Sequence, residues 1–425
     1  MRVRRDYQQP IFGTRRRSSI GPRGILIFGI AMIAILLFVQ LRLADLQNSV
    51  RGAFGIQAEP TQYPAEYATQ GVEQFIAGNL EAARQMLQRA VALQPENISY
   101  LYEYGRVLIE LERADEAVTV ADRAIEVAPN DVRGYALRAN ALKWSQPDQA
   151  IQDALRGQDI DATFAPLYAA QAIAYTNIQR YTQALEAGDR AITLDPMDAD
   201  AFRAYSWPLI LVGRSGEAIE MLEQAVAINP NLPGPYFQLA FEYKSRANDP
   251  AMAVAIYQHI IDNMNPSASD EAKAYLRICE TYAGIDRARF DVAEPYCRQA
   301  IQIDPNYGSA YRELGRMQYN RRNYEGAIES FRTCERLQAN LTTKDIECWS
   351  LRGLAHFWMN QCDEAWAVLN EAKTMGQIQG EAQSTMDIID TGIYNVTQLC
   401  TGYVGVPTPT LPPPTPIPPT PIGGL

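Results

Sequence analysis

Six cysteines are the most reactive side chains of this 425-residue chain, and all of them lie between residues 279 and 400. They are Cys279, Cys297, Cys334, Cys348, Cys362 and Cys400. No two stand as Cys-x-x-Cys, the spacing typical of zinc and thiol-redox sites. An even number in one region indicates disulfides, which persist outside the reducing cytoplasm. The alternative is free buried cysteines that replace small residues, as at Cys279 and Cys334.

The other side chains offer little for catalysis. The two histidines, His259 and His356, form no His-x-x-x-His pair. The sequence contains no Walker A loop, no nucleophile elbow and no dinucleotide-binding fingerprint. Acidic pairs such as Asp115-Glu116 stand at expected helix starts, where they complement the helix dipole. We therefore expect no enzymatic activity, no metal and no cofactor.

The net charge of −11 is unevenly distributed along the chain. Residues 1–23 contain seven arginines and one aspartate, which leaves −17 for the remainder. Binding to phosphate requires a basic surface. The acidic body therefore argues against nucleic acid as a partner.

A repeat of about 34 residues organises the chain that holds these side chains. Its clearest copy is 165–198, where Tyr168 and Ala172 share one face of a first helix. A second helix carries Ala184, and Pro196 ends it. We count nine copies, which start near residues 64, 98, 132, 165, 199, 233, 272, 308 and 346. The first small residue of the second helix recurs as Ala83, Ala117, Ala150, Ala184, Ala218, Ala253, Ala293, Ala327 and Ala365.

This pattern resembles the tetratricopeptide repeat family, in which each unit is a helix–turn–helix that stacks on its neighbours. The resemblance covers roughly residues 64–380. It implies an all-α fold, a right-handed superhelical solenoid of about nine tetratricopeptide repeats. Near-helical spacing of apolar residues over 381–399 predicts a capping helix, which an open array needs to cover its last apolar face. We expect solenoid and cap to span 64–402.

The repeat register also suggests how the cysteines pair. Cys279 and Cys297 fall on the two facing helices of the seventh unit. Cys334 ends a second helix and Cys348 begins the next helix. Cys362 starts the last second helix, and Cys400 ends the capping helix that runs antiparallel to it. The expected disulfides are Cys279–Cys297, Cys334–Cys348 and Cys362–Cys400.

The resemblance further implies a concave groove lined by the first helices. We map the following positions onto it as partner-binding candidates: Tyr102, Arg106, Arg133, Asn140, Lys143, Trp144, Arg203, Trp207, Phe237, Phe241, Lys244, Arg312, Arg316, Tyr319 and Asn320. Acidic residues at these positions are fewer, so we expect a basic and aromatic groove. Arginine grips carboxylates and aromatic rings anchor apolar side chains, which favours an extended peptide with acidic or aromatic residues. The alternative is ordinary packing between units with scattered surface arginines.

The segment before the repeats predicts a membrane anchor. Residues 24–41 are apolar and reach the lower limit for crossing a bilayer, roughly 17–25 residues. The Arg-rich segment 1–23 predicts a cytoplasmic N-terminus, and 42–63 reads as a linker. We expect one transmembrane signal anchor in the cytoplasmic membrane, with the repeat domain on the extracytoplasmic side. A cleaved signal peptide is the alternative, although no good cleavage site follows.

The C-terminal residues 403–425 are dominated by proline and threonine. Proline favours extended polyproline II, so this segment predicts a disordered tail or a spacer. Alternating threonines would allow O-glycosylation of an exported chain.

Together these observations predict a membrane-anchored, extracytoplasmic scaffold of bacterial type. It would mediate protein–protein interaction through the groove, in envelope assembly, secretion or surface organisation. The alternative is a structural spacer or self-assembling surface protein without a dedicated peptide ligand.

Overall fold

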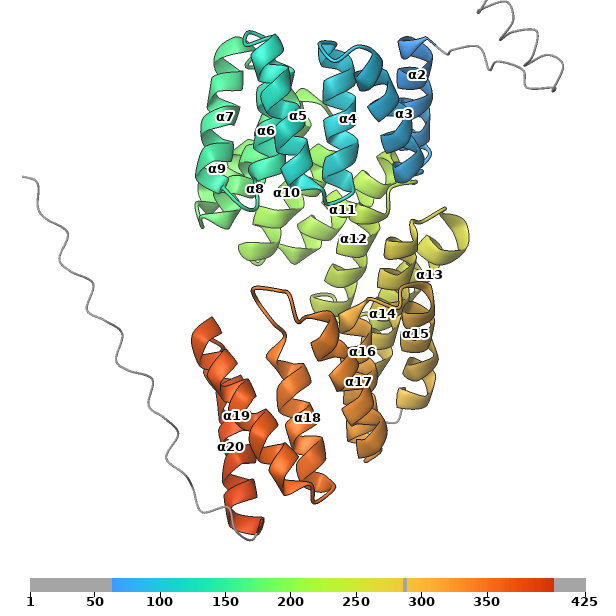
Figure 1. Ribbon diagram of the computed structural model, residues 1–425. Helices are drawn as coiled ribbons and strands as arrows, with labels where there is room; N and C mark the ends of the chain where they lie inside the picture. Colours follow the sequence, from blue (N-terminus) through green and yellow to red (C-terminus); the bar gives the residue numbers. More distant parts are fainter. Residues whose placement is uncertain (1–62, 286–288, 401–425) are drawn as a thin grey trace, which may run out of the picture. The chain divides into compact units, whose positions relative to one another are not determined.

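The structure, a computed structural model, describes residues 63–285 and 289–400. Within these ranges the chain forms nineteen helices and no strand (Figure 1). In chain order they are α2 (Pro64–Ile76), α3 (Leu80–Leu93), α4 (Ile98–Glu110), α5 (Ala114–Val127), α6 (Val132–Leu142), α7 (Pro147–Ile160), α8 (Ala165–Asn177), α9 (Tyr181–Leu194), α10 (Ala199–Leu211), α11 (Ser215–Ile228), α12 (Pro233–Ser245), α13 (Pro250–Asn263), α14 (Ala268–Ile285), α15 (Phe290–Ile303), α16 (Gly308–Asn320), α17 (Tyr324–Leu337), α18 (Ile346–Trp358), α19 (Cys362–Gln379) and α20 (Gln383–Leu399).

Consecutive helices pair as nine hairpins, from α2–α3 to α18–α19, so the predicted all-helical repeat array is confirmed. Eight hairpins begin at the predicted residue. The seventh begins at Ala268 instead of residue 272. The hydroxyl of Ser267 accepts the backbone N–H of Asp270 at 3.1 Å, and this cap starts α14 one turn earlier.

Small residues hold the two helices of each hairpin together. All nine alanines predicted at this contact are 0% exposed. Glycine allows a still closer approach at Gly105, where an added Cβ would lie 2.3 Å from Cδ2 of Leu137. Leu137 belongs to the next first helix, α6, so α4 and α6 approach closely only because residue 105 has no side chain.

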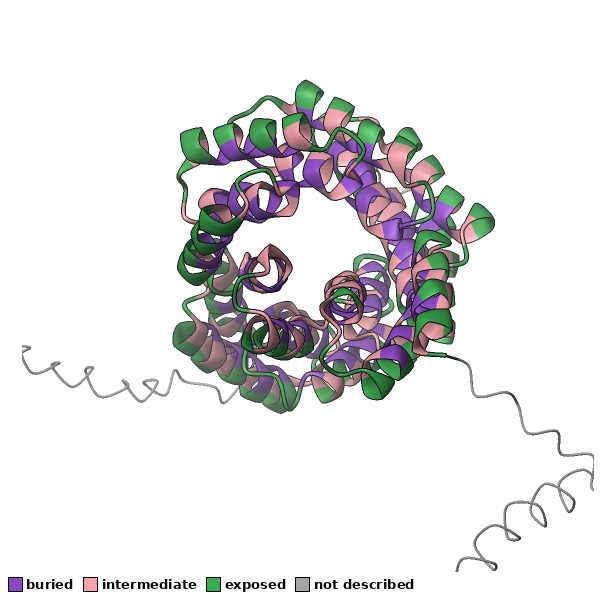
Figure 2. Ribbon diagram, turned by 90° about the horizontal axis from the view of Figure 1, so that it is seen from above, coloured by how far each residue is buried: buried purple, intermediate pink, exposed green. Residues whose placement is uncertain are grey.

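The hairpins follow one another around a ring, with exposed residues on its outer rim (Figure 2). After one turn the chain meets its own beginning. Leu232, just before α12, belongs to the same buried cluster as Leu80 of α3. The amide Nδ2 of Asn231 donates to the carbonyl oxygen of Ile76 at 2.9 Å. The first unit therefore packs against the sixth, which the repeat pattern does not predict.

The capping helix forms as expected, with α20 covering the last hairpin. Ile389 and Val396 are 0% exposed and lie in buried clusters with residues of α18 and α19. Gly392 faces Leu354 and Leu369 closely enough that an added Cβ would lie 2.8 Å from Cδ2 of Leu354. The cap thus closes the apolar end of the array, as an open solenoid requires.

The six cysteines form three disulfides in the structure: Cys279–Cys297, Cys334–Cys348 and Cys362–Cys400. These are the pairs that the repeat register suggests. The first joins the two helices of one hairpin, the second joins adjacent hairpins, and the third joins α19 to the end of the capping helix.

The chain divides into two units, Met1–Tyr63 and Pro64–Leu425, and the described helices belong to the second. The Arg-rich segment 1–23, the transmembrane helix expected at 24–41, nearly all of the linker 42–63 and the tail 403–425 lie outside the described residues. No helix within 63–285 and 289–400 combines the length and apolar character that a membrane span needs.

Candidate functional site

Two connected cavities lie on the surface formed mainly by the first helices of the hairpins. One has a volume of about 570 Å³ and is bounded by α4, α6 and the segments before α8 and α10; we name it the Tyr102 cavity. The other, of about 600 Å³, is bounded by α6, α10, α12 and α14; we name it the Trp207 cavity. Their common lining includes Ile109, Glu110, Asn140, Lys143, Ala169 and Asp200.

Ten of the fifteen groove positions line these cavities. Those in the Tyr102 cavity are Tyr102, Arg106, Arg133, Asn140 and Lys143, of which the last two also line the Trp207 cavity. Those in the Trp207 cavity alone are Trp144, Arg203, Trp207, Phe237 and Phe241. Outside both lie Lys244, Arg312, Arg316, Tyr319 and Asn320. The structure thus gathers the positions from the second to the sixth unit except Lys244, and it separates those of the eighth.

Stacked aromatic and cationic groups form one wall of the Tyr102 cavity. The guanidinium of Arg106 lies 5.2 Å from the ring centre of Phe75 and 5.9 Å from that of Tyr102. The Tyr102 ring in turn lies 6.1 Å from Phe164. Burial raises the pKa of the Tyr102 hydroxyl, so this group stays neutral and can donate a hydrogen bond to a bound molecule.

Carboxylates at the start of α10 also line the Tyr102 cavity. Asp198 caps α10, since its Oδ1 accepts the backbone N–H of Asp200 at 2.9 Å. Burial raises the pKa of Asp198 to about 6, and the nearby charge of Asp200 adds to the effect. This part of the lining is acidic, although the groove was expected to be basic.

Four aromatic rings give the Trp207 cavity its apolar character. Trp144 and Trp207 pack edge to face with ring centres 5.0 Å apart. Trp144 is 48% exposed and Phe241 is 52% exposed, although both are large apolar side chains on the concave side. The fourth ring, Phe237, lies 4.9 Å below the ammonium of Lys273.

Ion pairs across the turn of the superhelix close the Trp207 cavity. Arg203 of α10 faces Glu110 at the end of α4, with 3.4 Å between Nη1 and Oε2. Lys273 of α14 faces Glu112 in the turn after α4, with 3.3 Å between Nζ and Oε1. Both pairs are solvent-accessible in part, so each contributes little to stability. Glu110 and Glu112 belong to the second unit and Lys273 to the seventh, so residues of both units line one cavity.

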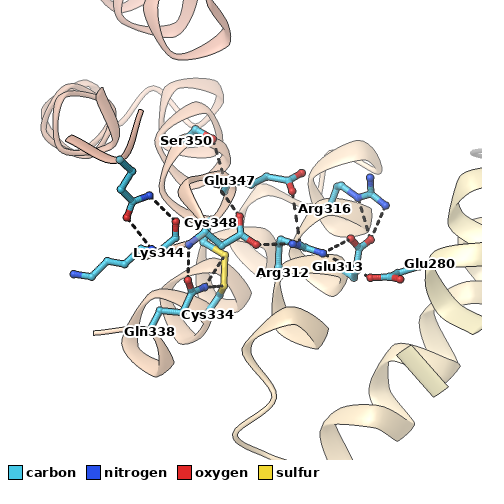
Figure 3. A network of polar contacts seen from close by, with 12 residues as sticks. Glu280, Arg312, Glu313, Arg316, Cys334, Gln338, Lys344, Glu347, Cys348 and Ser350 are labelled. Carbon is cyan, nitrogen blue, oxygen red and sulfur yellow. Dashed lines mark hydrogen bonds and ion pairs between the residues drawn. A yellow bond between two sulfur atoms is a disulfide. The ribbon is translucent and has the colours of Figure 1, made fainter. Parts of the chain in front are cut away.

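The expectation of a basic groove is not met. The Tyr102 cavity has three basic and five acidic side chains in its lining. The Trp207 cavity has four basic and five acidic side chains. The arginines outside the cavities are also paired: Arg316 binds Glu313 at 2.6 Å, and Arg312 points toward Glu313 and Asp345 (Figure 3). The groove is therefore mixed in charge and no longer favours an acidic peptide.

Several lining residues were missed because they stand in helix caps and turns or next to the mapped positions. The acidic ones are Glu103, Glu112, Asp195, Asp198, Glu242 and Asp270. One signal was available at Gln238 and Glu242. The equivalent positions of the fourth unit are Ala170 and Ala174, which are both buried. The two polar residues therefore depart from the clearest copy of the repeat.

The two histidines take structural positions. His259 stacks on Tyr236 with ring centres 5.3 Å apart. His356 is 5% exposed, and its Nδ1 lies 2.6 Å from Oε1 of Gln361. In the described ranges no group of three or more His, Cys, Asp or Glu side chains is placed to hold a metal ion.

Two segments match models of one protein family. Residues 74–141 and 285–340 each match a tetratricopeptide repeat model, and both segments lie within the nine hairpins. The chain is a tetratricopeptide repeat protein. Repeats of this family form scaffolds for protein–protein interaction, and proteins built from them are generally not enzymes.

Relatives of this repeat protein include subunits of larger assemblies. The BBSome complex member BBS4 homolog of Drosophila melanogaster is 24% identical over 352 residues, covering 77% of this chain and 68% of that protein. The Protein STIP1 homolog of Dictyostelium discoideum is 30% identical over 107 residues, covering 25% of this chain and 19% of that protein. The structure of the APC/C hetero-tetramer Cut9-Hcn1 has a TM-score of 0.52 at 14% identity, covering 73% of this chain and 59% of that one. At this identity the structure supports the fold alone.

Proposed function

We propose that this chain is a scaffold that binds an extended segment of another protein in the Trp207 cavity. The observation that carries the proposal is the exposure of Trp144 and Phe241 inside a cavity of about 600 Å³. Exposed large aromatics that converge in a concave site are typical of the residues that dominate binding energy at interfaces. The relative named as a BBSome complex member is a subunit of a larger assembly, which supports the same class of function.

The double variant Trp144→Ala/Phe241→Ala tests this proposal. We expect the double variant to reduce recovery of the partner at least about tenfold. Truncating an aromatic anchor that a partner buries typically costs more than about 1 kcal/mol of binding free energy. The measurement is quantitative crosslinking and capture of the full chain from intact cells. Trp358→Ala is the matched control, since Trp358 is 58% exposed and lies outside both cavities.

Equal recovery from the double variant and the wild type would exclude the cavity as the binding site. Capture of the chain's own copies as the main product would instead favour the alternative, a self-assembling spacer or surface protein.

We further propose that the repeats lie on the extracytoplasmic side of the cytoplasmic membrane, anchored through residues 24–41. There they would serve envelope assembly, secretion or surface organisation. The three cysteine pairs support an oxidising compartment. The bacterial type rests on the sequence alone, since neither relative described above is bacterial.

Thiol alkylation of the protein, taken from intact cells and denatured without a reductant, checks this placement. We expect no alkylation of the six cysteines in denatured protein until a reductant is added, because all six would be disulfide-bonded. Complete alkylation without a reductant would place the repeats in a reducing compartment.

A further inference from the structure

We propose that the Trp207 cavity receives a basic side chain, an arginine or lysine of the partner's extended segment, at Gln238 and Glu242 of α12. This inference rests on the proposed function and names the chemistry of its ligand. It reverses the acidic preference that the sequence suggested.

Two buried acceptors in this cavity lack a hydrogen-bond donor. Glu242 is 1% exposed, and its Oε2 accepts no hydrogen bond from any described residue. Gln238 is 9% exposed; its Nε2 donates to the hydroxyl of Ser206 at 2.7 Å, which leaves its Oε1 without a donor. The two residues are four apart on one helix and therefore share a face. Both residues line the cavity, and the two oxygens without donors, Oε1 of Gln238 and Oε2 of Glu242, accept hydrogen bonds.

Four cations line this cavity, and all are engaged elsewhere. Lys143 donates from Nζ to Oδ1 of Asn140 at 3.2 Å. Arg203 pairs with Glu110, and Lys273 pairs with Glu112. Arg277 pairs with Glu280, with 2.6 Å between Nη1 and Oε2. None of them forms an ion pair with Glu242 among the described residues, so the carboxylate has room for a cation supplied by a ligand.

Burial of Glu242 without a hydrogen-bond donor for its Oε2 changes the pKa of the carboxyl group. Desolvation raises the pKa of its carboxyl, and the charge of Arg246 on the same helix offsets this only in part. Such a site favours any ligand that brings a positive charge and N–H donors to the carboxylate.

The surrounding rings favour the same ligand. Trp144, Trp207 and Phe241 line the cavity that contains Glu242. The faces of aromatic rings attract ammonium and guanidinium groups, and arginine is the more frequent partner. An acidic side chain would meet a carboxylate here, and an apolar one would leave both acceptors without donors. A basic side chain can pack against the rings and donate hydrogen bonds to both acceptors.

The test compares the binding of three labelled decapeptides to the full chain by fluorescence anisotropy. The peptides alternate alanine with arginine, with citrulline or with glutamate. Citrulline keeps the planar shape of arginine but has no charge, and a carbonyl oxygen replaces one of the two NH2 groups. We expect the arginine peptide to bind at least tenfold more tightly than the other two.

The variant Glu242→Gln should weaken binding of the arginine peptide at least tenfold, and Gln238→Leu should weaken it less. Glu329→Gln is the matched control, because it also removes one negative charge but its side chain is 75% exposed and outside the cavities. We expect the control to bind like the wild type. Circular dichroism of each variant shows whether it is folded, and the two α12 variants provide independent tests.

Equal weakening by Glu242→Gln and Glu329→Gln would overturn the inference, because it would indicate general attraction to an acidic surface. Equal binding of the citrulline peptide would also overturn it. If the Trp144/Phe241 variant loses its cellular partner while Glu242→Gln retains it, the inference fails and the proposed function stands. If both variants retain the partner, both proposals fail.

Discussion

The double variant Cys362→Ser/Cys400→Ser is expected to lower the free energy of unfolding of the C-terminal units by about 4 kcal/mol. The two cysteines are 38 residues apart, which is the largest separation among the three disulfides. A cross-link that closes a longer loop removes more conformational entropy from the unfolded chain. This disulfide should therefore contribute more than the other two.

Its position in the array adds to the expected effect. Cys400 follows the last residue of α20, and Cys362 is the first residue of α19. Between them α20 buries Ile389 and Val396 on the last hairpin. The cap packs on α18 and α19, so its release exposes the final apolar face of the array directly.

Guanidinium unfolding followed by circular dichroism measures the loss, and hydrogen exchange locates it. We expect faster exchange in α18–α20 and unchanged exchange in α6–α9, which lie several hairpins away. The variant Cys279→Ser/Cys297→Ser is the control, since its loop of 18 residues lies within one hairpin. Protected α20 amides and an unchanged unfolding midpoint would show that packing alone holds the cap.

Features set by neighbouring units could be predicted from the sequence. The buried alanines recur at one position of each unit, and such a residue is fixed by the contact between two successive helices. The cysteine pairs followed from the same register, because Cys362 and Cys400 fall at the same end of antiparallel helices. Even the displaced start of α14 had a local signal, Ser267, as a capping residue.

Features set by distant units could not be predicted. The contact between Asn231 and Ile76 joins residues 155 apart, and it depends on the small rotation between successive hairpins. The pattern of one 34-residue unit does not show after how many hairpins the superhelix completes a turn. The cavity between the second and seventh units therefore appears only in three dimensions.

The charge of the groove was misjudged for a related reason. The prediction counted the positions that point inward and left out carboxylates from helix caps and neighbouring positions. Asp345, which caps α18, and Glu313, which follows Arg312, are two such groups. They neutralise arginines that the sequence offered as free cations for a ligand.

Arg312 is accordingly expected to be a stabilising residue, and Arg312→Met should lower the free energy of unfolding by about 2–3 kcal/mol. Arg312 bridges three consecutive first helices (Figure 3). Its guanidinium lies within 4.0 Å of carboxylate oxygens of Glu280 on α14, Glu313 on α16, and Asp345 and Glu347 at the start of α18. Removing this cation would leave Asp345 and Glu347 without its charge, while Glu280 and Glu313 keep their ion pairs with Arg277 and Arg316. We place the loss below the usual 3–5 kcal/mol for a broken buried pair because the side chain is 23% exposed.

Arg316→Met is the matched control for this prediction. Arg316 lies one turn further along α16 and is 38% exposed. Among the described residues it pairs with Glu313 alone, so its loss should cost less than about 1 kcal/mol. Denaturant unfolding of both variants gives the comparison. Equal stability of the two variants would show that the bridge across α14, α16 and α18 contributes nothing beyond a single surface pair. If Arg312→Met is the less stable variant, a charge reversal at Arg312 that abolishes partner binding needs a stability measurement before the loss is assigned to the interface.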